Sequence, residues 1–218
     1  MTPSNPFSHA TTLHHAAVSL VPLARAHTTD LQEATSDGDL SALWFTAIPN
    51  AQGMAAEIDR RLGLQVLGSM NPFAVISNLT GPHCGKAVGM TTYMNIDASN
   101  RRVEIGSTWY RGSVQRSALN TACKRLLLAH AFDTLNCIAV EFRTHLMNHA
   151  SRKAIERLGA KLDGVLRSHQ LTHNPIHGTT LRDTCVYSIT ASEWPAVRAH
   201  LDFQLNKPRY IQTVTMPC

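Results

Sequence analysis

The sequence lacks any apolar run that approaches the roughly 20 residues a membrane-spanning helix needs. Its first fifteen residues also lack the basic block and the apolar block of a secretory signal. Both absences argue against a membrane protein and against a secreted one. We therefore expect a cytoplasmic protein with no membrane partner.

Cysteine is scarce and scattered. The five cysteines form no C-x-x-C pair, which argues against a disulfide framework and against a structural zinc site. Histidine is more frequent, with twelve residues, and His145 and His149 stand four apart. That spacing suits a metal only when both side chains lie on one helix and a third ligand converges on them. This pair crosses an expected strand–helix boundary, so we expect no metal.

Charged residues are also few, at 16%, whereas hydrophobic residues make up 44% of the 218. Such a chain can bury a sizeable core, so we expect one domain over 16–205, with flexible tails at 1–15 and 206–218. The net charge is +5, but the 20 Lys and Arg residues form no basic block. A nucleic-acid partner is therefore disfavoured, because dispersed positive charge also suits an anionic cofactor or an acidic partner.

Hydrophobic periodicity predicts strands and helices that alternate along the chain. Alternating or continuous apolar runs predict strands at 17–22, 71–78, 85–96, 101–110, 137–144, 161–171 and 183–190. The 3.6-residue period predicts helices at 25–36, 38–46, 51–64, 116–135, 148–158 and 191–204. This succession indicates a mixed α/β domain without internal repeats.

The stretch SVQRSALNTACKRLLLAHAFD, residues 113–133, joins a polar start without an acid to a strongly amphipathic helix. A helix leaves its first backbone N–H groups unpaired, and its dipole makes that end positive. Small side chains and two cations, Arg111 and Arg116, stand at this end. The stretch therefore fits an anion such as phosphate, although capping and solubility alone would explain the same residues.

The order of VEIGSTWY, a small-residue turn, NTACKRLLLAHAFD and IAVEFRTHLMNHASRKAIERLGAKLDGVLRSH resembles the GNAT acetyltransferase superfamily, specifically its RimJ/RimL-type branch. The resemblance covers about residues 17–205 and is densest over 103–169. It implies an α/β fold with a mixed, mostly antiparallel central sheet flanked by helices. It also implies acetyl-CoA as the co-substrate and an amine as the acceptor, and it allows a homodimer.

In that superfamily acetyl-CoA lies along the fourth strand and the next helix, with a pyrophosphate loop of the pattern Q/R-x-x-G-x-G/A. Here Ala118 and Asn120 replace the two glycines. Alanine still lets a diphosphate approach the backbone, whereas asparagine is bulkier but can donate a hydrogen bond. The cofactor-binding residues that the resemblance implies are Trp109, Tyr110, Gln115, Arg116, Ser117, Ala118, Leu119, Asn120 and Asn148.

Acetyl transfer to an amine needs a base, a donor for the carbonyl oxygen and a donor for the leaving thiolate. The resemblance implies Glu104 as the base, backbone N–H groups of a bulge within 107–110 as the oxygen donors, and Ser151 beside the thiolate. Plainer roles stay open. Glu104 could be an outward-facing acid paired with Arg101 or Arg102, and Asn148 and Ser151 could simply begin a helix.

Three other side chains are candidates on the acceptor side. His169 is the second choice for the base, and Arg167 stands two residues away, where both would share one face of a strand. A solvent-exposed strand histidine is the plainer alternative. Trp44 would form a wall of the acceptor cleft, because that region caps the cleft in relatives, although an isolated tryptophan also suits a core.

These inferences predict an acetyl-CoA-dependent N-acetyltransferase in which a primary amine attacks the thioester directly. The acceptor is a protein N-terminus, as the RimJ/RimL resemblance implies, or a small-molecule amine. Two alternatives remain open at this point. The altered loop would also suit a CoA-binding regulatory module without turnover, and the positive charge would suit a nucleic-acid-associated protein.

Overall fold

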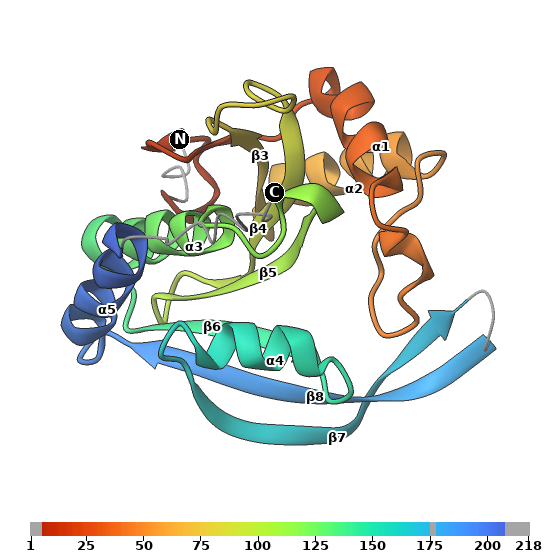
Figure 1. The fold of residues 1–218 in the computed structure, drawn as a ribbon. Helices are drawn as coiled ribbons and strands as arrows, with labels where there is room; N and C mark the ends of the chain where they lie inside the picture. Colours follow the sequence, from red (N-terminus) through yellow and green to blue (C-terminus); the bar gives the residue numbers. More distant parts are fainter. Residues whose placement is uncertain (1–5, 175–177, 208–218) are drawn as a thin grey trace, which may run out of the picture.

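An eight-stranded sheet forms the centre of the protein in the computed structural model, which describes residues 6–174 and 178–207. The strands lie in the order β1-β2-β3-β4-β5-β6-β8-β7 (Figure 1). Their bounds are β1 Leu13–His15, β2 Val18–Pro22, β3 Met70–Ser77, β4 Ala87–Asp97, β5 Arg102–Tyr110, β6 Ala139–His145, β7 Lys161–Asn174 and β8 Gly178–Thr190. Neighbouring strands are antiparallel except β5 and β6, which are parallel. The mixed, mostly antiparallel sheet that the sequence predicts is confirmed.

Helices cover both faces of this sheet (Figure 1). They are α1 Thr28–Ser36, α2 Met54–Val66, α3 Leu119–Ala129, α4 His149–Glu156 and α5 Trp194–Asn206. On one face, α1 and α2 pack over a cluster that includes Leu31, Ile58 and Trp109. On the other face, α3, α4 and α5 pack over the main core. None of the described helices combines the length and apolarity that crossing a membrane requires.

The helix α3 carries the chain from β5 to β6 and thereby makes these two strands parallel. Its buried residues recur at helical spacing and enter the main core; they are Leu119, Ala122, Cys123, Lys124, Leu127 and Leu128. A crossover helix of this kind is the usual connection between parallel strands, because a tight turn can join only antiparallel neighbours. The helix therefore begins where β5 ends, beside the parallel pair.

The expected helix over 38–46 is wrong. Gly38 and Asp39 both have left-handed backbone angles, with φ of 97° and 49°, and such residues interrupt a right-handed helix. A short 3-10 turn, Leu40–Ala42, follows them, and Leu40 supplies its buried side chain. The rest of this stretch is an irregular connection between α1 and α2, and its Trp44 contacts His145 at the end of β6.

The expected flexible tail over 1–15 also needs correction over its described part, 6–15. Phe7 is buried in the main core, and the Asn71 side chain donates hydrogen bonds to the backbone carbonyls of Phe7 and His9. Leu13–His15 then pairs with β2 and extends the sheet. At the other end α5 reaches Asn206, so most of the predicted tail at 206–218, like residues 1–5, lies outside the described residues.

Candidate active site

The sheet opens between β5 and β6. These strands pair at three levels, Arg102 with Ala139, Val103 with Val140 and Glu104 with Glu141. Both strands then continue, as far as Tyr110 and His145, without further pairing between them. Backbone groups on this side of β5 are therefore not used in the ladder beyond Glu104. An extended ligand can meet them there, because main-chain N–H and C=O groups seek hydrogen-bond partners.

A β-bulge deforms β5 inside this opening. Met90 pairs with Trp109 and Thr92 with Gly106, so Ser107 and Thr108 together oppose Thr91 alone. Ser107 has a φ of 48°, which turns the backbone away from regular strand geometry. The bulge expected within 107–110 is thus present. A bulge leaves backbone groups out of the regular ladder, and this one lies beside the opening, where a carbonyl oxygen that gains charge would need donors.

Buried cations hold the bulge from both faces of the sheet. From α2, Arg61 Nη1 donates to Thr92 Oγ1 at 2.8 Å and to the Ser107 carbonyl at 3.3 Å. From α3, Lys124 Nζ donates to Thr108 Oγ1 at 2.8 Å. Arg61 also binds Glu57, whereas Lys124 makes no ion pair with any residue that the structure describes. Burial lowers the pKa of Lys124 to about 8.

Replacing Lys124 with methionine should remove a pH-dependent part of the stability. An unfolded chain keeps its lysine protonated to about its ordinary pKa of 10.5, whereas native Lys124 loses its proton near 8. Between these values the unfolded state binds more protons, so stability should rise with pH. Urea unfolding at pH 7.5 and 9.5 measures this rise, which should be smaller in Lys124→Met. Parallel pH profiles for the two proteins would contradict it.

Glu104 lies at the closed end of the opening and is only 5% exposed. Asn95 Nδ2 donates to its carboxylate at 2.7 Å, and Arg143 Nε lies 3.6 Å away. Arg102 instead contacts Glu141, at 2.5 Å. The alternative of an outward-facing acid paired with Arg101 or Arg102 is therefore wrong. Burial raises the pKa of the Glu104 carboxyl, and the contacts with Asn95 and Arg143 oppose that rise without cancelling it.

Gly106 leaves room for this carboxylate. A Cβ atom at position 106 would lie 2.7 Å from Glu104 Oε1 and 2.6 Å from Met94 Sδ. Both distances are shorter than contacts between such atoms allow, so a side chain here would displace the carboxylate. The position of the Glu104 carboxylate therefore depends on a glycine two residues later in VEIG.

The turn before α3 exposes backbone donors. The first helical hydrogen bond runs from Ala122 N to the Ala118 carbonyl, so the N–H groups of residues 120 and 121 precede it. Ala118, in the N-cap position, has no side chain that could cap them. Gln115 folds back and donates to the Tyr110 carbonyl at 2.8 Å, and Arg116 has a φ of 58°. The helix end is thus available to an anion.

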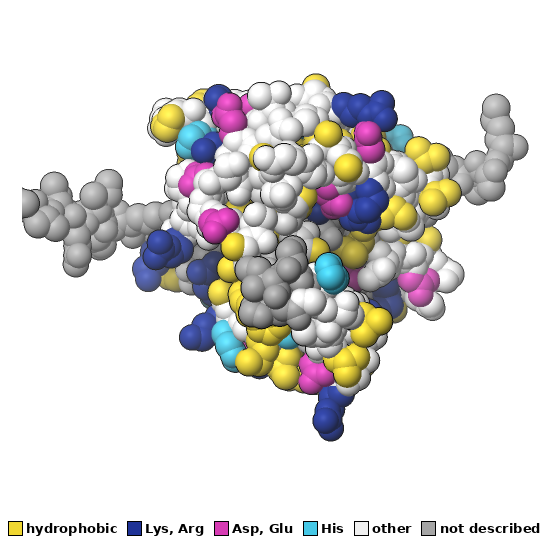
Figure 2. Space-filling view, turned by 90° about the vertical axis from the view of Figure 1, so that its right-hand side faces the viewer, with side chains coloured by type: hydrophobic (Ala, Val, Ile, Leu, Met, Phe, Trp, Pro, Cys, Tyr) yellow, Lys and Arg dark blue, Asp and Glu magenta, His cyan; other side chains and the backbone are white. Residues whose placement is uncertain are grey.

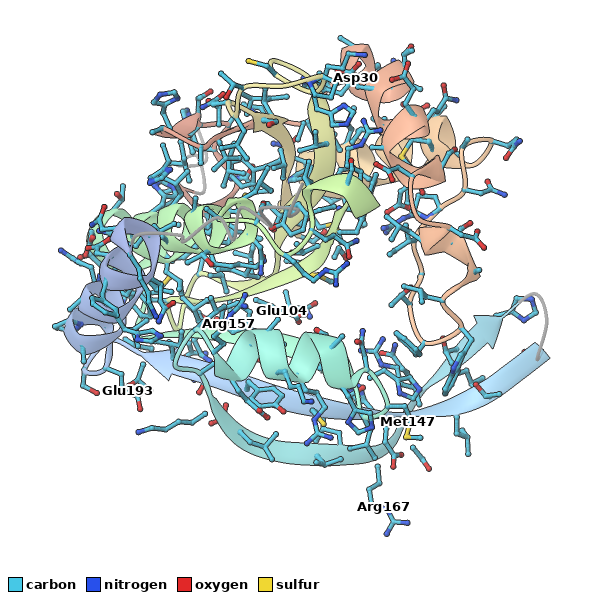
Figure 3. The ribbon with its side chains drawn as sticks, viewed as in Figure 1. Asp30, Glu104, Met147, Arg157, Arg167 and Glu193 are labelled. Carbon is cyan, nitrogen blue, oxygen red and sulfur yellow. The ribbon has the colours of Figure 1, made fainter. Side chains whose placement is uncertain are left out.

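A pocket of about 190 Å³ adjoins this helix end. Its lining comes from the loop, α3, α5 and the end of α4, and consists of Arg116, Ser117, Thr121, Arg157, Leu158, Leu201 and Gln204. Figure 3 shows Arg157 at the end of α4 that lies toward α5. Neither arginine forms an ion pair within the described part of the chain, so both cations can bind an anionic ligand. Sequence reasoning missed Arg157, although a cation just before the helix-ending Gly159 was a usable signal.

Three of the predicted cofactor contacts have side chains that are buried in the core. Trp109 is buried beneath α1 and α2, whereas Tyr110 and Leu119 are buried in the main core. The bulge at Ser107 shifts which side chains of β5 point to each face of the sheet. Leu119 lies on the apolar face of α3. For these three residues only the backbone remains as a cofactor contact.

Asn148 caps α4. Its Oδ1 accepts a hydrogen bond from the Ser151 backbone N–H at 3.0 Å, which confirms the helix-start interpretation of these two residues. Asn148 stands three residues after β6, the strand that borders the opening, and Ser151 lies in the first turn of α4. A further role for Asn148 in holding the cofactor, and for the Ser151 hydroxyl beside the thiolate, stays a prediction.

Separate replacement of Asn148 and Ser151 by alanine should distinguish these roles. Loss of the Asn148 cap is expected to cost about 1 kcal/mol of folding free energy, whereas Ser151→Ala keeps the capped N–H. If Ser151 Oγ supports the leaving thiolate, Ser151→Ala should lower kcat about tenfold with an unchanged melting temperature. Steady-state kinetics and thermal melts measure the two effects. A full rate in Ser151→Ala would limit this residue to the helix start.

The candidate residues for the acceptor side are found around the face of the sheet that carries α1 and α2. Trp44, in the connection between these helices, meets the His145 ring edge-on, with centroids 5.1 Å apart. His169 reaches the same face, where its Nδ1 lies 3.2 Å from Thr184 Oγ1. Arg167 does not, and Figure 3 shows it pointing away from the protein. The expectation that Arg167 and His169 share a face is wrong, because Ser168, with a φ of 47°, lies in a bulge of β7.

Surface charge is dispersed. Figure 2, which views the molecule from the right-hand side of Figure 1, shows Lys and Arg side chains scattered over that face with acidic ones between them. The net charge of +5 therefore does not form a continuous basic surface on this face.

Comparison with known proteins identifies the family. Residues 18–161 match the family described as "Acetyltransferase (GNAT) domain". The chain is also similar to "Putative ribosomal N-acetyltransferase YdaF" of Bacillus subtilis (strain 168), with 30% identity over 110 residues. That match covers 50% of this chain and 57% of the Bacillus protein.

Solved structures agree with this match. A GCN5-related N-acetyltransferase from Brucella melitensis has a TM-score of 0.80 at 28% identity, and the match covers 92% of this chain and 87% of that one. Mycobacterium smegmatis RimJ in complex with CoA-disulfide shares the fold, with a TM-score of 0.69 at 21% identity over 89% of this chain and 93% of the other. The matched family region spans well over half of the sequence, and the chain belongs to the GNAT N-acetyltransferase family.

Proposed function

We propose that the protein transfers the acetyl group of acetyl-CoA to a primary amine that enters from the α1–α2 face. The opening between β5 and β6 carries this proposal, because it combines a bulged strand edge with a buried carboxylate at its closed end. The bulge offers donors to a carbonyl oxygen, and Glu104 offers a base within the same opening.

The residues around the opening fit acetyl-CoA. The diphosphate would meet the backbone N–H groups at the start of α3, where Ala118 keeps the approach clear. Arg116 and Arg157 would bind phosphate oxygens in the adjoining pocket, since neither cation has a carboxylate partner among the residues described. The extended pantetheine arm would run beside the unpaired edge of β5, with Asn148 on the other side of the opening.

Bound acetyl-CoA supplies the thioester carbonyl, and attack by the amine forms the amide and releases CoA. Glu104 would accept the amine proton, directly or through a water, because burial has raised its pKa toward that of an effective base at neutral pH. Backbone N–H groups of the bulge would stabilise charge on the carbonyl oxygen. Ser151 Oγ would donate to the departing sulfur.

The acceptor that we propose is the N-terminal amine of a protein. The Bacillus protein has the name "Putative ribosomal N-acetyltransferase YdaF", and we extend a protein acceptor to this chain as part of the proposal. A free α-amino group has a pKa near 8, against about 10.4 for a lysine side chain, so it needs less help from a base at neutral pH.

Release of CoA in the presence of a panel of amines tests the proposal. Acetyl-CoA binding measured by calorimetry should accompany amine-dependent release of free thiol. Binding without release for any amine would instead favour a regulatory module that lacks turnover. Absence of binding would reject both.

Replacing Arg157 with glutamine should weaken acetyl-CoA binding about tenfold, and the loss should shrink as salt rises. The reason is that this cation faces the pocket without a carboxylate partner in the described chain. Arg25→Gln is a matched control, because Arg25 is exposed and pairs with Asp59 away from the pocket. Equal affinities of the two variants would show that Arg157 does not meet phosphate. Dephospho-CoA would separate a contact with the 3′-phosphate from one with the diphosphate.

A further inference from the structure

His145 ends β6 on the acceptor side of the opening. It shares a face with Arg143 and Glu141, because alternate residues of a strand point the same way. Arg143 contacts Glu104, which places all of these side chains on the side of the catalytic acid. His145 stands four residues beyond the last β5–β6 pair, about 13 Å along the strand. The bulge at Ser107 and Thr108 lies at a similar height on β5, so His145 faces it across the opening.

The protonation of His145 is set by its surroundings. The Met147 backbone N–H donates to Nδ1 at 3.1 Å, so Nδ1 carries a lone pair. Burial lowers the pKa of the ring, and nearby Arg182 acts in the same direction. The neutral ring therefore holds its one proton on Nε2, and this nitrogen can donate a hydrogen bond but cannot accept a proton.

This donor is buried without a protein partner. His145 is 5% exposed, and its Nε2 has no hydrogen-bond acceptor among the described residues. An unsatisfied buried donor costs roughly 1–3 kcal/mol, so such groups are uncommon unless a ligand uses them. The edge-on contact with Trp44 holds the ring beside the connection between α1 and α2. The cost of the orphaned donor, together with this position at the end of β6, points to an acceptor atom that a ligand supplies.

Arg182 adds positive charge at the same place. It is half-buried on β8, donates from Nε to Thr184 Oγ1 at 3.1 Å, and forms no ion pair in the part of the chain described. Thr184 is the residue that pairs with His145. A guanidinium and an Nε2–H group both only donate, and together they suit an oxygen atom.

We infer that His145 Nε2–H binds the oxygen of an α-aminoacyl group, so that the acceptor carries a carbonyl or carboxylate on the carbon next to its amine. The inference rests on the proposed function and assigns the residue that recognises the acceptor. Glu104 serves the amine, and His145 serves the neighbouring oxygen. A simple alkylamine offers no such oxygen and would leave the donor unpaired. A peptide N-terminus supplies an amide carbonyl, and a free amino acid supplies a carboxylate.

Kinetics with matched acceptors test this inference. Wild type, His145→Leu and His145→Gln are compared with glycinamide, a short peptide, glycine and propylamine, and each variant is expressed relative to wild type for each amine. His145→Leu should raise KM for glycinamide and the peptide about tenfold, and should leave the KM for acetyl-CoA and the values for propylamine unchanged. His145→Gln should restore most of the loss, because its amide nitrogen can replace Nε2 as a donor.

His130→Leu is the control for loss of a half-buried histidine, since burial also lowers the pKa of His130, which lies at the far end of α3. It should retain wild-type KM values, and melting temperatures verify that all variants fold. Glycine against the peptide decides which source of the oxygen the site prefers. Unchanged KM in His145→Leu, or equal losses with glycinamide and propylamine, would overturn the inference while leaving acetyl transfer intact. Absence of turnover with every amine would remove the proposed function and the inference with it.

Discussion

Replacement of Glu104 by glutamine is expected to lower kcat/KM about a hundredfold at neutral pH and to leave acetyl-CoA affinity unchanged. Glutamine keeps the shape of the side chain and its reach toward Asn95, but it cannot accept a proton. The amine then has to lose its proton to solvent before it attacks. The rate of the variant should therefore recover in part as pH rises and the free amine becomes more abundant.

The same variant should reveal the cost of burying this carboxylate. Burial raises the pKa of Glu104 in the native protein, so the unfolded chain loses the corresponding proton at a lower pH. Above the unfolded pKa the native state then binds more protons, and native stability falls as pH rises through this range. Glu104→Gln removes that fall. Its melting temperature relative to wild type should increase from acidic to neutral pH.

Glu141→Gln is the matched control, because Glu141 pairs with Glu104 across the strands and shares its face, yet it is already bound by Arg102 and Arg143. Its rate should stay within a few fold of wild type. A full rate for Glu104→Gln across pH, together with a collapse in His169→Leu, would transfer the role of base to His169. The coupling of lost activity to gained stability is specific to a buried functional acid and would not arise from a misfolded variant.

Most of the fold could be predicted because its elements have strong periodic patterns. The strand at 139–145 alternates the buried Val140, Phe142 and Thr144 with polar side chains, and α3 repeats apolar side chains at helical spacing, so packing and local preference agree. The false helix at 38–46 shows where this reasoning fails. Its apolar spacing looked helical, but left-handed angles at Gly38 and Asp39 decide the backbone. Asp37 then binds Arg111 and Ser113, a tertiary contact that no local pattern contains.

For the candidate site, the sequence could propose positions but not the directions of the side chains. Glu104 and the turn before α3 were predicted from the order of motifs. The directions of Trp109 and Arg167 depend on bulges at Ser107 and Ser168, since one inserted residue moves all later side chains to the other face. Arg157 and the orphaned donor of His145 depend on packing between elements far apart in the sequence. Only the folded structure brings these groups together.

Replacement of Ala118 by glutamate is expected to reduce CoA affinity by more than a hundredfold, the largest effect on binding that we predict. The side chain would project from the N-cap of α3 toward the space assigned to the diphosphate. It would both fill that space and place a negative charge beside negative phosphates, and it would capture the N–H groups that the phosphates need.

The stability of Ala118→Glu should stay the same or increase while its CoA affinity falls, so unfolding cannot explain the lost binding. An acidic side chain at a helix N-terminus is favourable by about 0.3–1 kcal/mol, so Ala118→Glu should melt at or above the wild-type temperature. Ala118→Gln has the same size without the charge and separates steric blockage from repulsion. If repulsion contributes, the glutamate variant should bind less tightly than the glutamine variant, and high salt should narrow the gap between them. Calorimetry with CoA measures both affinities. Wild-type affinity in a stably folded Ala118→Glu variant would show that the diphosphate does not bind at the start of α3, and the proposed cofactor site would have to be abandoned.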